Sequence, residues 1–212
     1  MDNTQIIEFT IASLAFGFKP GPGMLVHAMR AVTDGRKAAL TMAVGTETGH
    51  ALTFLLLWAG LTSLSIYNQH IAPFLALIGG LSLVYIGVKS ILKNSRNTYS
   101  LDDNNRLSGK SYYLTGVGWA FINPINIAFY ASILPTFFKV EELVVNDMLL
   151  ALTILILSIF FSHVVFIYSA STIKEMFSTS GGKSLANIIG NLVFISIGLY
   201  VAIIKVIEIS DW

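Results

Sequence analysis

A carboxylate and an imidazole lie close together inside one apolar segment of the chain. Glu47 and His50 are three residues apart, so a helix would place both side chains on one face. A charged group at the centre of a bilayer costs on the order of 2.5–3.5 kcal/mol on insertion scales, so it normally faces a cavity or a partner. We interpret Glu47 as a proton carrier or as the partner of a substrate ammonium, with His50 sharing the proton. The alternative is a neutral Glu47 that hydrogen-bonds a neighbouring helix.

The same Glu-x-x-His spacing also occurs in the di-iron sites of helical bundles. Those sites need two copies of the motif and further carboxylates, whereas this chain has one copy. Cysteine is absent, which excludes disulfides, thiol catalysis and cysteine-based metal sites. The sequence also lacks a nucleotide-binding fingerprint, a catalytic Ser/His/Asp spacing and a basic, aromatic-rich patch. We therefore expect a protein that is not an enzyme, with no cofactor, no metal and no nucleic-acid partner.

Helix-breaking residues interrupt two of the apolar segments. The first break is Lys19-Pro20-Gly21-Pro22-Gly23 and the second is Asn123-Pro124-Ile125-Asn126. Each proline removes a backbone donor and clashes with the preceding turn, and glycine loosens the helix further. In a bilayer the freed carbonyl groups are costly unless protein or a watery cavity satisfies them. We expect the two breaks to face each other at one central cavity, although a structural kink would also explain either break.

The breaks supply further candidates for a transport site. Lys19 could bind a substrate carboxylate, pair with Glu47, or extend to the outer interface. Asn123 and Asn126 offer amide donors and acceptors, with Tyr130 one turn further on. The candidate proton-coupling residues are Glu47 and His50. The candidate transport site as a whole is Lys19, Pro20, Gly21, Pro22, Gly23, Glu47, His50, Asn123, Pro124 and Asn126.

Other polar or small residues inside the apolar segments are interpreted as packing groups. Hydrogen bonding between helices accounts for His163, Asn187 and Asn191, and we assign no role to His27. The pattern Gly45-x-x-x-Gly49 permits close helix crossing, which we interpret as packing within one chain. A homodimer is left open.

Six apolar segments position these residues. Each is near the ~20 residues that a helix needs to cross a hydrocarbon core of ~30 Å. Hydrophobic residues make up 54% of the chain and charged residues 12%, against about 25% charged residues in soluble domains. The sequence therefore predicts an all-α integral membrane protein with six transmembrane helices, of which the first and fourth are broken. The segments are Ile6–Met29, Ala38–Tyr67, Ile71–Leu92, Tyr112–Phe138, Met148–Tyr168 and Leu185–Ile207.

Lysine and arginine are distributed unevenly between the connections. The first, third and fifth connections hold ten of the 13, the other connections and the termini hold two, and Lys19 lies within a segment. By the positive-inside rule the odd connections face the cytoplasm and both termini lie outside. We divide the chain into a three-helix repeat at 1–93, a polar cytoplasmic linker at 94–111 and a second repeat at 112–212. Together they form one membrane domain, and three spans per half give an inverted repeat.

Several of these motifs together resemble the LysE/RhtB family of amino-acid exporters, the LysE-type translocators. The resemblance rests on Pro20-Gly21-Pro22-Gly23-Met24-Leu25, Asp34-Gly35-Arg36-Lys37, Gly45, Gly49, Asn123-Pro124 and Leu134-Pro135-Thr136-Phe137. It implies a secondary active transporter in the plasma (inner) membrane that exports amino acids or similar small amino-acid metabolites. Its partners would be that substrate, protons and the lipid bilayer. The chain departs from the family pattern at Gly23, where Asn is usual, and at Thr136, where Gln is usual, and these departures bear on substrate identity.

Two other classes of function are the alternatives to an amino-acid exporter. A divalent-cation exporter of the wider superfamily would need several carboxylates facing one cavity, and the first and fourth segments offer none there. An intramembrane enzyme would need a nucleophile–base or multi-ligand cluster, for which Glu47, His50 and His163 are the available groups. A membrane scaffold that does not transport is the remaining alternative.

Overall fold

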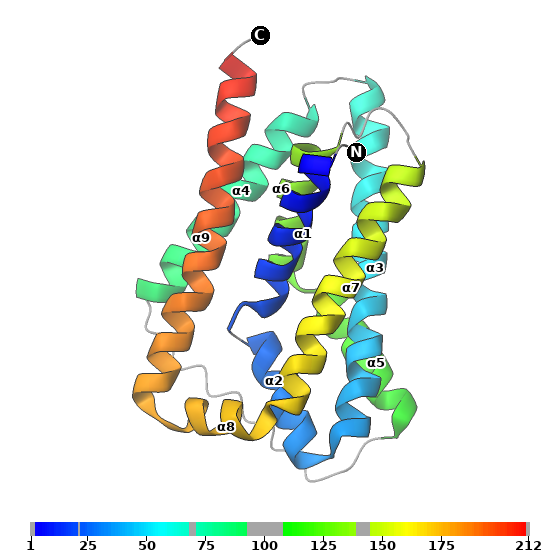
Figure 1. Ribbon diagram of the computed structural model, residues 1–212. Coiled ribbons are helices and arrows are strands. Elements are labelled where there is room, and N and C mark those ends of the chain that lie inside the picture. Colours follow the sequence, from blue (N-terminus) through cyan, green and yellow to red (C-terminus); the bar gives the residue numbers. More distant parts are fainter. Residues whose placement is uncertain (1–2, 21, 68–70, 93–107, 139–144, 211–212) are drawn as a thin grey trace.

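The computed structural model describes residues 3–20, 22–67, 71–92, 108–138 and 145–210, and these residues fold as α-helices joined by short connections (Figure 1). Gly21 and most of the linker predicted at 94–111 lie outside the described residues. The helices are α1 (Asn3–Phe18), α2 (Pro22–Thr33), α3 (Arg36–Tyr67), α4 (Ile71–Leu92), α5 (Gly109–Phe121), α6 (Pro124–Phe137), α7 (Val145–Tyr168), α8 (Ala170–Ser178) and α9 (Ser180–Ser210).

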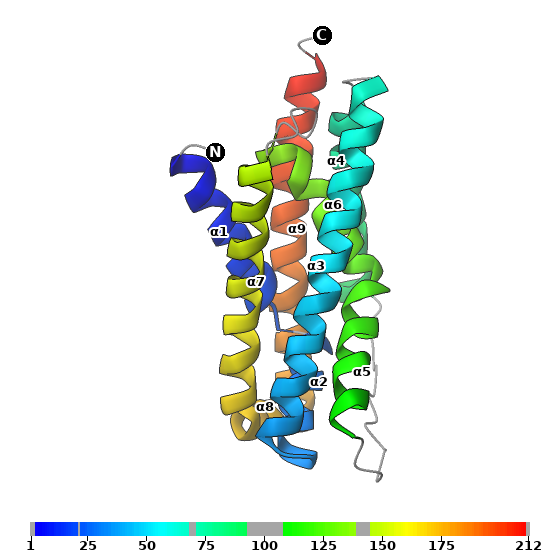
Figure 2. The same ribbon diagram turned by 90° about the vertical axis from the view of Figure 1, so that its right-hand side faces the viewer.

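The long helices run between the two ends of one bundle (Figures 1 and 2). The first turn of α1 and the last turn of α9 lie at the same end, which is the upper end in both views. The short helix α8 lies across the opposite end, between α7 and α9. A chain that crosses the membrane an even number of times is expected to have its first and last helices end on the same side, as these two do.

Three stretches of the described residues are long and apolar enough to cross a membrane. They are Ala72–Lys89, Val145–Tyr168 and Ile188–Ser210, and the bent pair α5–α6 adds a fourth if it counts as one span. The helix α3 is not among them, and it carries the buried polar residues Thr46, Glu47, His50 and Thr53. The all-α membrane class is thus confirmed, whereas the count of six spans stays a prediction.

Both predicted breaks divide a segment into two helices. The first segment becomes two helices: α1 ends at Phe18 and α2 begins at Pro22. The fourth becomes α5 and α6, which bend by 55° at Ile122 and Asn123. Pro124 occupies the first turn of α6, where a missing backbone donor leaves no intrahelical bond unmade.

The connection between the last two long helices differs from the expected loop. Residues 170–178 form α8, and α9 already begins at Ser180, so the predicted sixth segment starts too late. The reason lies in packing, because Ala170 and Ile173 are buried against Met24 and Ala28 of α2. A short helix is stable here because α2 covers its apolar side.

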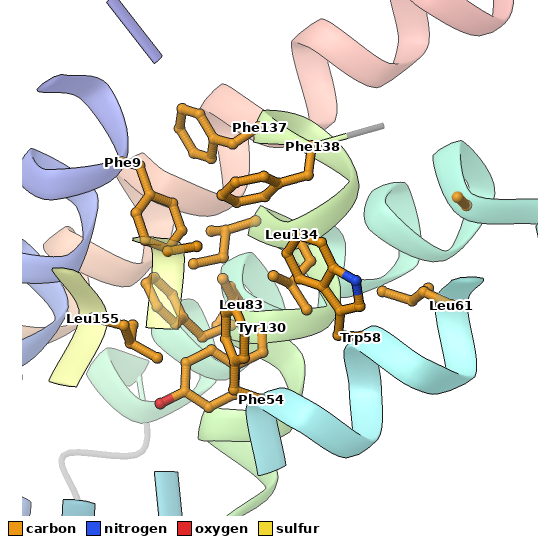
Figure 3. Packing of buried hydrophobic residues seen from close by; sticks show 14 of the residues in the cluster. Phe9, Phe54, Trp58, Leu61, Leu83, Tyr130, Leu134, Phe137, Phe138 and Leu155 are labelled. Carbon is orange, nitrogen blue, oxygen red and sulfur yellow. The ribbon is translucent and has the colours of Figure 1, made fainter. Parts of the chain in front are cut away.

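The interior has an apolar part and a polar part. Aromatic residues from α1, α3 and α6 form the apolar cluster, which includes Phe9, Phe54, Trp58, Tyr130 and Phe137 (Figure 3). Their rings meet mostly edge to face, as in the Phe9–Phe137 pair with centroids 5.7 Å apart. Buried polar side chains include His27, Thr46, Glu47, His50 and His163. The aromatic cluster is thus separate from Glu47 and its neighbouring imidazoles.

Glycines bring two helix pairs into backbone contact. A Cβ at Gly45 of α3 would fall against the carbonyl of Tyr113 in α5, and one at Gly49 would lie 2.5 Å from the carbonyl of Val117. A Cβ at Gly198 of α9 would likewise meet the carbonyl of Gly80 in α4. The interpretation of Gly45-x-x-x-Gly49 as packing within one chain is therefore confirmed, and the homodimer stays a prediction.

Candidate functional site

A cavity of about 90 Å³ lies where the two breaks meet. Both breaks contribute to its wall, as expected from the sequence, and it has room for several water molecules. Thr46 and His50 reach it from α3, and His163 reaches it from α7. The remaining lining residues are Phe16, Gly17, Lys19, Gly23, Met24, Trp119, Asn123, Ile125, Asn126, Ile159 and Phe194.

At the second break, two asparagine side chains satisfy the freed backbone. The Asn123 side-chain oxygen accepts a hydrogen bond from the Ile125 N–H at 3.0 Å and so caps α6. Pro124 has no N–H to offer the carbonyl of Ala120 four residues earlier, and the Asn126 side-chain amide donates to that carbonyl at 2.8 Å instead. Both predicted site residues therefore hold the bend in place while they line the cavity.

The first break is held by contacts from other helices. The Lys19 ammonium lies over the Phe194 ring of α9, 3.6 Å from its centroid. A Cβ at Gly190 of α9 would fall against the carbonyl of Pro20, so only glycine allows this approach. In this conformation Lys19 lies on Phe194 and Glu47 Oε1 pairs with a different side chain, so the pairing of Lys19 with Glu47 stays an untested alternative.

The partner of Glu47 is His163 of α7. Glu47 Oε1 lies 2.8 Å from His163 Nδ1, and each residue is 6% exposed. The interpretation of His163 as a helix-packing group is therefore incomplete, since it bonds the single carboxylate of α3. Glu47 Oε2 is buried and has no hydrogen-bond partner among the described residues. A carboxyl group in this position can hold its proton or pass it to the imidazole.

Three imidazole rings lie side by side here, and the middle one is that of His163. The His27 and His163 rings stack with centroids 4.0 Å apart, and the His50 and His163 rings are 6.5 Å apart and nearly parallel. His50 Nδ1 lies 2.6 Å from the Tyr130 hydroxyl, and His27 Nε2 lies 3.2 Å from the Thr46 hydroxyl. Glu47 and His50, which were expected on one helix face, thus belong to a larger group that we call the histidine cluster: His27, Glu47, His50, Tyr130 and His163.

Sequence reasoning left two members of this cluster, His27 and His163, out of the candidate transport site, although His163 was named among the groups available to an enzyme. A signal was available for His163, because Ser158, Ser162 and His163 lie on one side of an otherwise apolar helix and all three are buried. For His27 no local pattern distinguishes the residue from an isolated polar group. Within the described residues, no group of three or more His, Asp, Glu or Cys side chains is arranged to hold a metal ion.

An ion pair anchors the far end of α2. Arg30 Nη1 donates to Asp34 Oδ2 at 2.6 Å, and the Arg30 guanidinium lies 5.4 Å from the centre of the Tyr112 ring on α5. Burial acts to raise the pKa of Asp34, but hydrogen bonds from Arg30, Tyr112 and Thr33 and the charge of Arg30 outweigh it and lower that pKa. The carboxylate therefore stays ionised and holds α2 against α5.

Neither a comparison with curated proteins nor one with solved structures gives a match. A model of the LysE type translocator family matches residues 14–205. The matched region holds both helix breaks, the cavity and every member of the histidine cluster. The chain therefore belongs to the LysE type translocator family.

Proposed function

We propose that the protein is a secondary active exporter of amino acids or similar small amino-acid metabolites, driven by the proton gradient across the plasma (inner) membrane. Family membership supports transport rather than catalysis. The proposal places the transport site at the cavity between the breaks and the coupling proton on Glu47, with His50 nearby. A proton that enters down the membrane potential supplies ~2.3 kcal/mol per 100 mV, which is sufficient for modest uphill export.

The observation that carries this proposal is the buried contact between Glu47 and His163 beside the cavity. The two side chains can share one proton, and the carboxyl can lose it only if the site is hydrated or if a cation approaches. A substrate ammonium is such a cation. Proton loss and substrate binding are then linked at one carboxylate. This link is what a transporter needs in order to exchange a proton for a substrate molecule.

Lys19 provides a positive charge in the wall of this cavity, which His163, the partner of Glu47, also lines. Its ammonium lines the wall and lies on an aromatic ring, where it can receive a substrate carboxylate. A cation beside the cavity also disfavours a divalent cation as cargo, which is why we prefer the amino-acid exporter to the cation exporter. A zwitterionic substrate would bridge Lys19 and Glu47.

Orientation is part of the proposal. The lysine and arginine distribution supports termini on the outside, with the linker at 94–111 in the cytoplasm and the repeats at 1–93 and 112–212 inverted. Because the chain contains no cysteine, single cysteines introduced at Asn3 and Asn104 can be labelled from outside with an impermeant reagent. Asn3→Cys is expected to react and Asn104→Cys to stay protected, and the reverse pattern would overturn the orientation.

The test of function is counterflow in proteoliposomes with a panel of radiolabelled amino acids. At least one amino acid should exchange, and a proton gradient should drive its accumulation. Glu47→Gln keeps the shape and most of the hydrogen bonding but cannot titrate, so it should abolish proton-driven accumulation while some counterflow between equal pools remains. His50→Gln should slow transport less than Glu47→Gln does.

A matched control is Glu8→Gln in α1, because Glu8 is an exposed carboxylate that contacts Tyr200 at 3.4 Å. This variant should accumulate substrate as the unmodified protein does. If Glu47→Gln also accumulates substrate as well as the unmodified protein, then Glu47 is structural. If no amino acid on the panel exchanges, the proposed substrate class is wrong.

A further inference from the structure

We propose that His27 is a second proton-holding group, which takes the proton released by the Glu47–His163 pair and thereby links protonation to the first helix break. This inference rests on the proposed function, because it concerns the path of the coupling proton. His27 does not itself line the cavity, but it contacts Gly23, Thr46 and His163, which do, so its role would be that of a positioning residue.

The hydrogen bonds of His27 fix one ring nitrogen and leave the other variable. Nδ1 lies 2.8 Å from the carbonyl of Gly23, and a carbonyl only accepts, so Nδ1 carries a hydrogen in every state. Nε2 lies 3.2 Å from the Thr46 hydroxyl, which can donate or accept. The protonation state of His27 is therefore decided at Nε2.

Thr46 satisfies both states of that nitrogen. In the neutral state, the Thr46 hydroxyl donates to His27 Nε2. In the protonated state, Nε2–H donates to the Thr46 oxygen, and the hydroxyl hydrogen turns to the carbonyl of Met42 at 3.0 Å. A fully buried imidazole that is hydrogen-bonded in both states can gain and lose a proton without leaving a polar group unpaired.

Thr46 also connects His27 to the cavity. Its side chain lines the cavity that His163 lines, whereas His27 lies behind it. The proton balance is simple: the O–H bond on Glu47 or the N–H bond on His163 breaks, and an N–H bond forms at His27 Nε2. Cavity water and the Thr46 hydroxyl carry the proton between them, so the cluster keeps its total charge.

Titratable groups on the neighbouring helices bear on the charge of His27. From α7, His163 stacks on its ring, and two imidazolium ions 4.0 Å apart would repel each other. From α3, Glu47 and His50 belong to the same cluster, and a Glu47 that has lost its proton favours a cation on His27. On α2 itself, Arg30 is one turn away but is paired with Asp34. The remaining charged groups are Lys19 on the far side of the break and, on exposed positions of α8, Lys174 and Glu175.

Protonation of His27 would act directly on the break. Gly23 is the second residue of α2, and its carbonyl receives the His27 hydrogen bond. When the imidazole becomes cationic, that bond becomes charge-assisted and roughly twice as strong. The position of the proton is therefore communicated to the first turn of α2 by one hydrogen bond.

The experiment compares His27→Gln with the unmodified protein in proteoliposomes, with a radiolabelled amino acid that the panel identifies. Glutamine can still bond Gly23 and Thr46 but holds no proton. We expect proton-driven accumulation to be lost and counterflow to lose its dependence on pH, with counterflow itself retained. Thr46→Val removes only the hydroxyl and should lower proton-driven transport by roughly two- to tenfold, the range for one neutral hydrogen bond. Retention of the normal pH profile in His27→Gln would overturn the proposal.

The matched control is Tyr113→Phe, which removes a hydroxyl that donates to Thr48 on the same helix α3 but away from the cavity. It should leave accumulation and pH profile unchanged. A measurement independent of transport is ¹⁵N NMR of histidine-labelled protein in bilayers, which is tractable because the chain has four histidines. The His27 ring should convert from the neutral to the cationic form as the pH is lowered. A ring that keeps one neutral tautomer throughout overturns the proposal, whereas absence of any proton-driven transport in the unmodified protein counts against the proposed function instead.

Discussion

At the break between α5 and α6, side chains of the same segment satisfy the freed backbone, whereas at the break between α1 and α2 the contacts come largely from other helices. Asn123 and Asn126 bond the backbone on either side of the second break. At the first break, Gly190 and Phe194 of α9 contact Pro20 and Lys19. The second break is therefore a bend that its own sequence maintains.

The first break, in contrast, depends on the position of α9. Within the part of this segment that the structure describes, His27 bonds the carbonyl of Gly23, and by our proposal that bond varies with the proton on the ring. A bend held from outside can change when the surrounding helices move. We infer that conformational change during transport uses the first break more than the second.

The largest effect is expected from Gly190→Ala, which should disrupt the first break. The added Cβ would fall against the Pro20 carbonyl and 3.3 Å from Lys19 Cε, and a backbone carbonyl cannot move aside as a side-chain end can. Overpacking of this kind costs about 1–3 kcal/mol, and transport should fall with it. Thermal unfolding and counterflow of the purified protein measure both effects.

The control for this variant is Gly118→Ala on α5, where a Cβ would meet no atom within 4 Å. It should be neutral, or stabilising by up to ~1 kcal/mol because alanine favours the helix. Equal behaviour of the two variants would show that the contact between α9 and the first break is not needed.

An effect on stability of similar range, but of more specific origin, is expected at the second break. Asn126→Ala leaves the buried Ala120 carbonyl unpaired, which should lower the free energy of unfolding by about 1–3 kcal/mol. Pro124→Ala restores an N–H at the residue that would normally bond this carbonyl. In the Pro124→Ala variant, Asn126→Ala should therefore lower the free energy of unfolding by less than it does in the unmodified protein. A double-mutant cycle of unfolding free energies measures the difference. Additive costs would mean that the Asn126 amide does not substitute for the missing backbone donor.

The smallest effect on stability is expected from Lys19→Met. Its cation–π contact is worth about 0.5–1 kcal/mol at an exposed site and about 2 kcal/mol when desolvated. Apparent substrate affinity in counterflow should fall more clearly than stability, since the variant removes the proposed carboxylate partner. Phe194→Leu removes the ring but keeps the ammonium, so it separates the two roles. If both variants lower affinity equally, Lys19 acts through its packing on Phe194.

The sequence predicted the positions of both breaks because proline chemistry is local. Pro20, Pro22 and Pro124 lack a donor in any fold, and a bilayer makes that loss expensive. The burial of Glu47 was predictable for the same reason, as a lone carboxylate in an apolar segment. The helix α8 was missed because its stability comes from α2, which lies far away in the sequence.

The partner of Glu47 was not predictable from spacing. His163 is 116 residues away, and only the packing of α3 against α7 brings the two together. The roles of Asn123 and Asn126 were only half predictable, because their amides could serve the backbone or a substrate until the bonds to Ile125 and Ala120 were seen. The polarity of a residue in an apolar segment indicates that it lies near a cavity. Which partner that residue bonds depends on the tertiary structure.

The glycine contacts between α3 and α5 have a mechanical consequence. Two helices whose backbones touch at Gly45 and Gly49 cannot slide or separate without losing that contact, so Glu47 and the second break should travel as one body. His163 and His27 belong to helices outside this body. Spin-label distances between α3 and α5 should then stay constant during transport while those between α3 and α7 change. The 2.8 Å contact of Glu47 with His163 connects the α3–α5 pair to α7. We expect this contact to form and break once in each transport cycle.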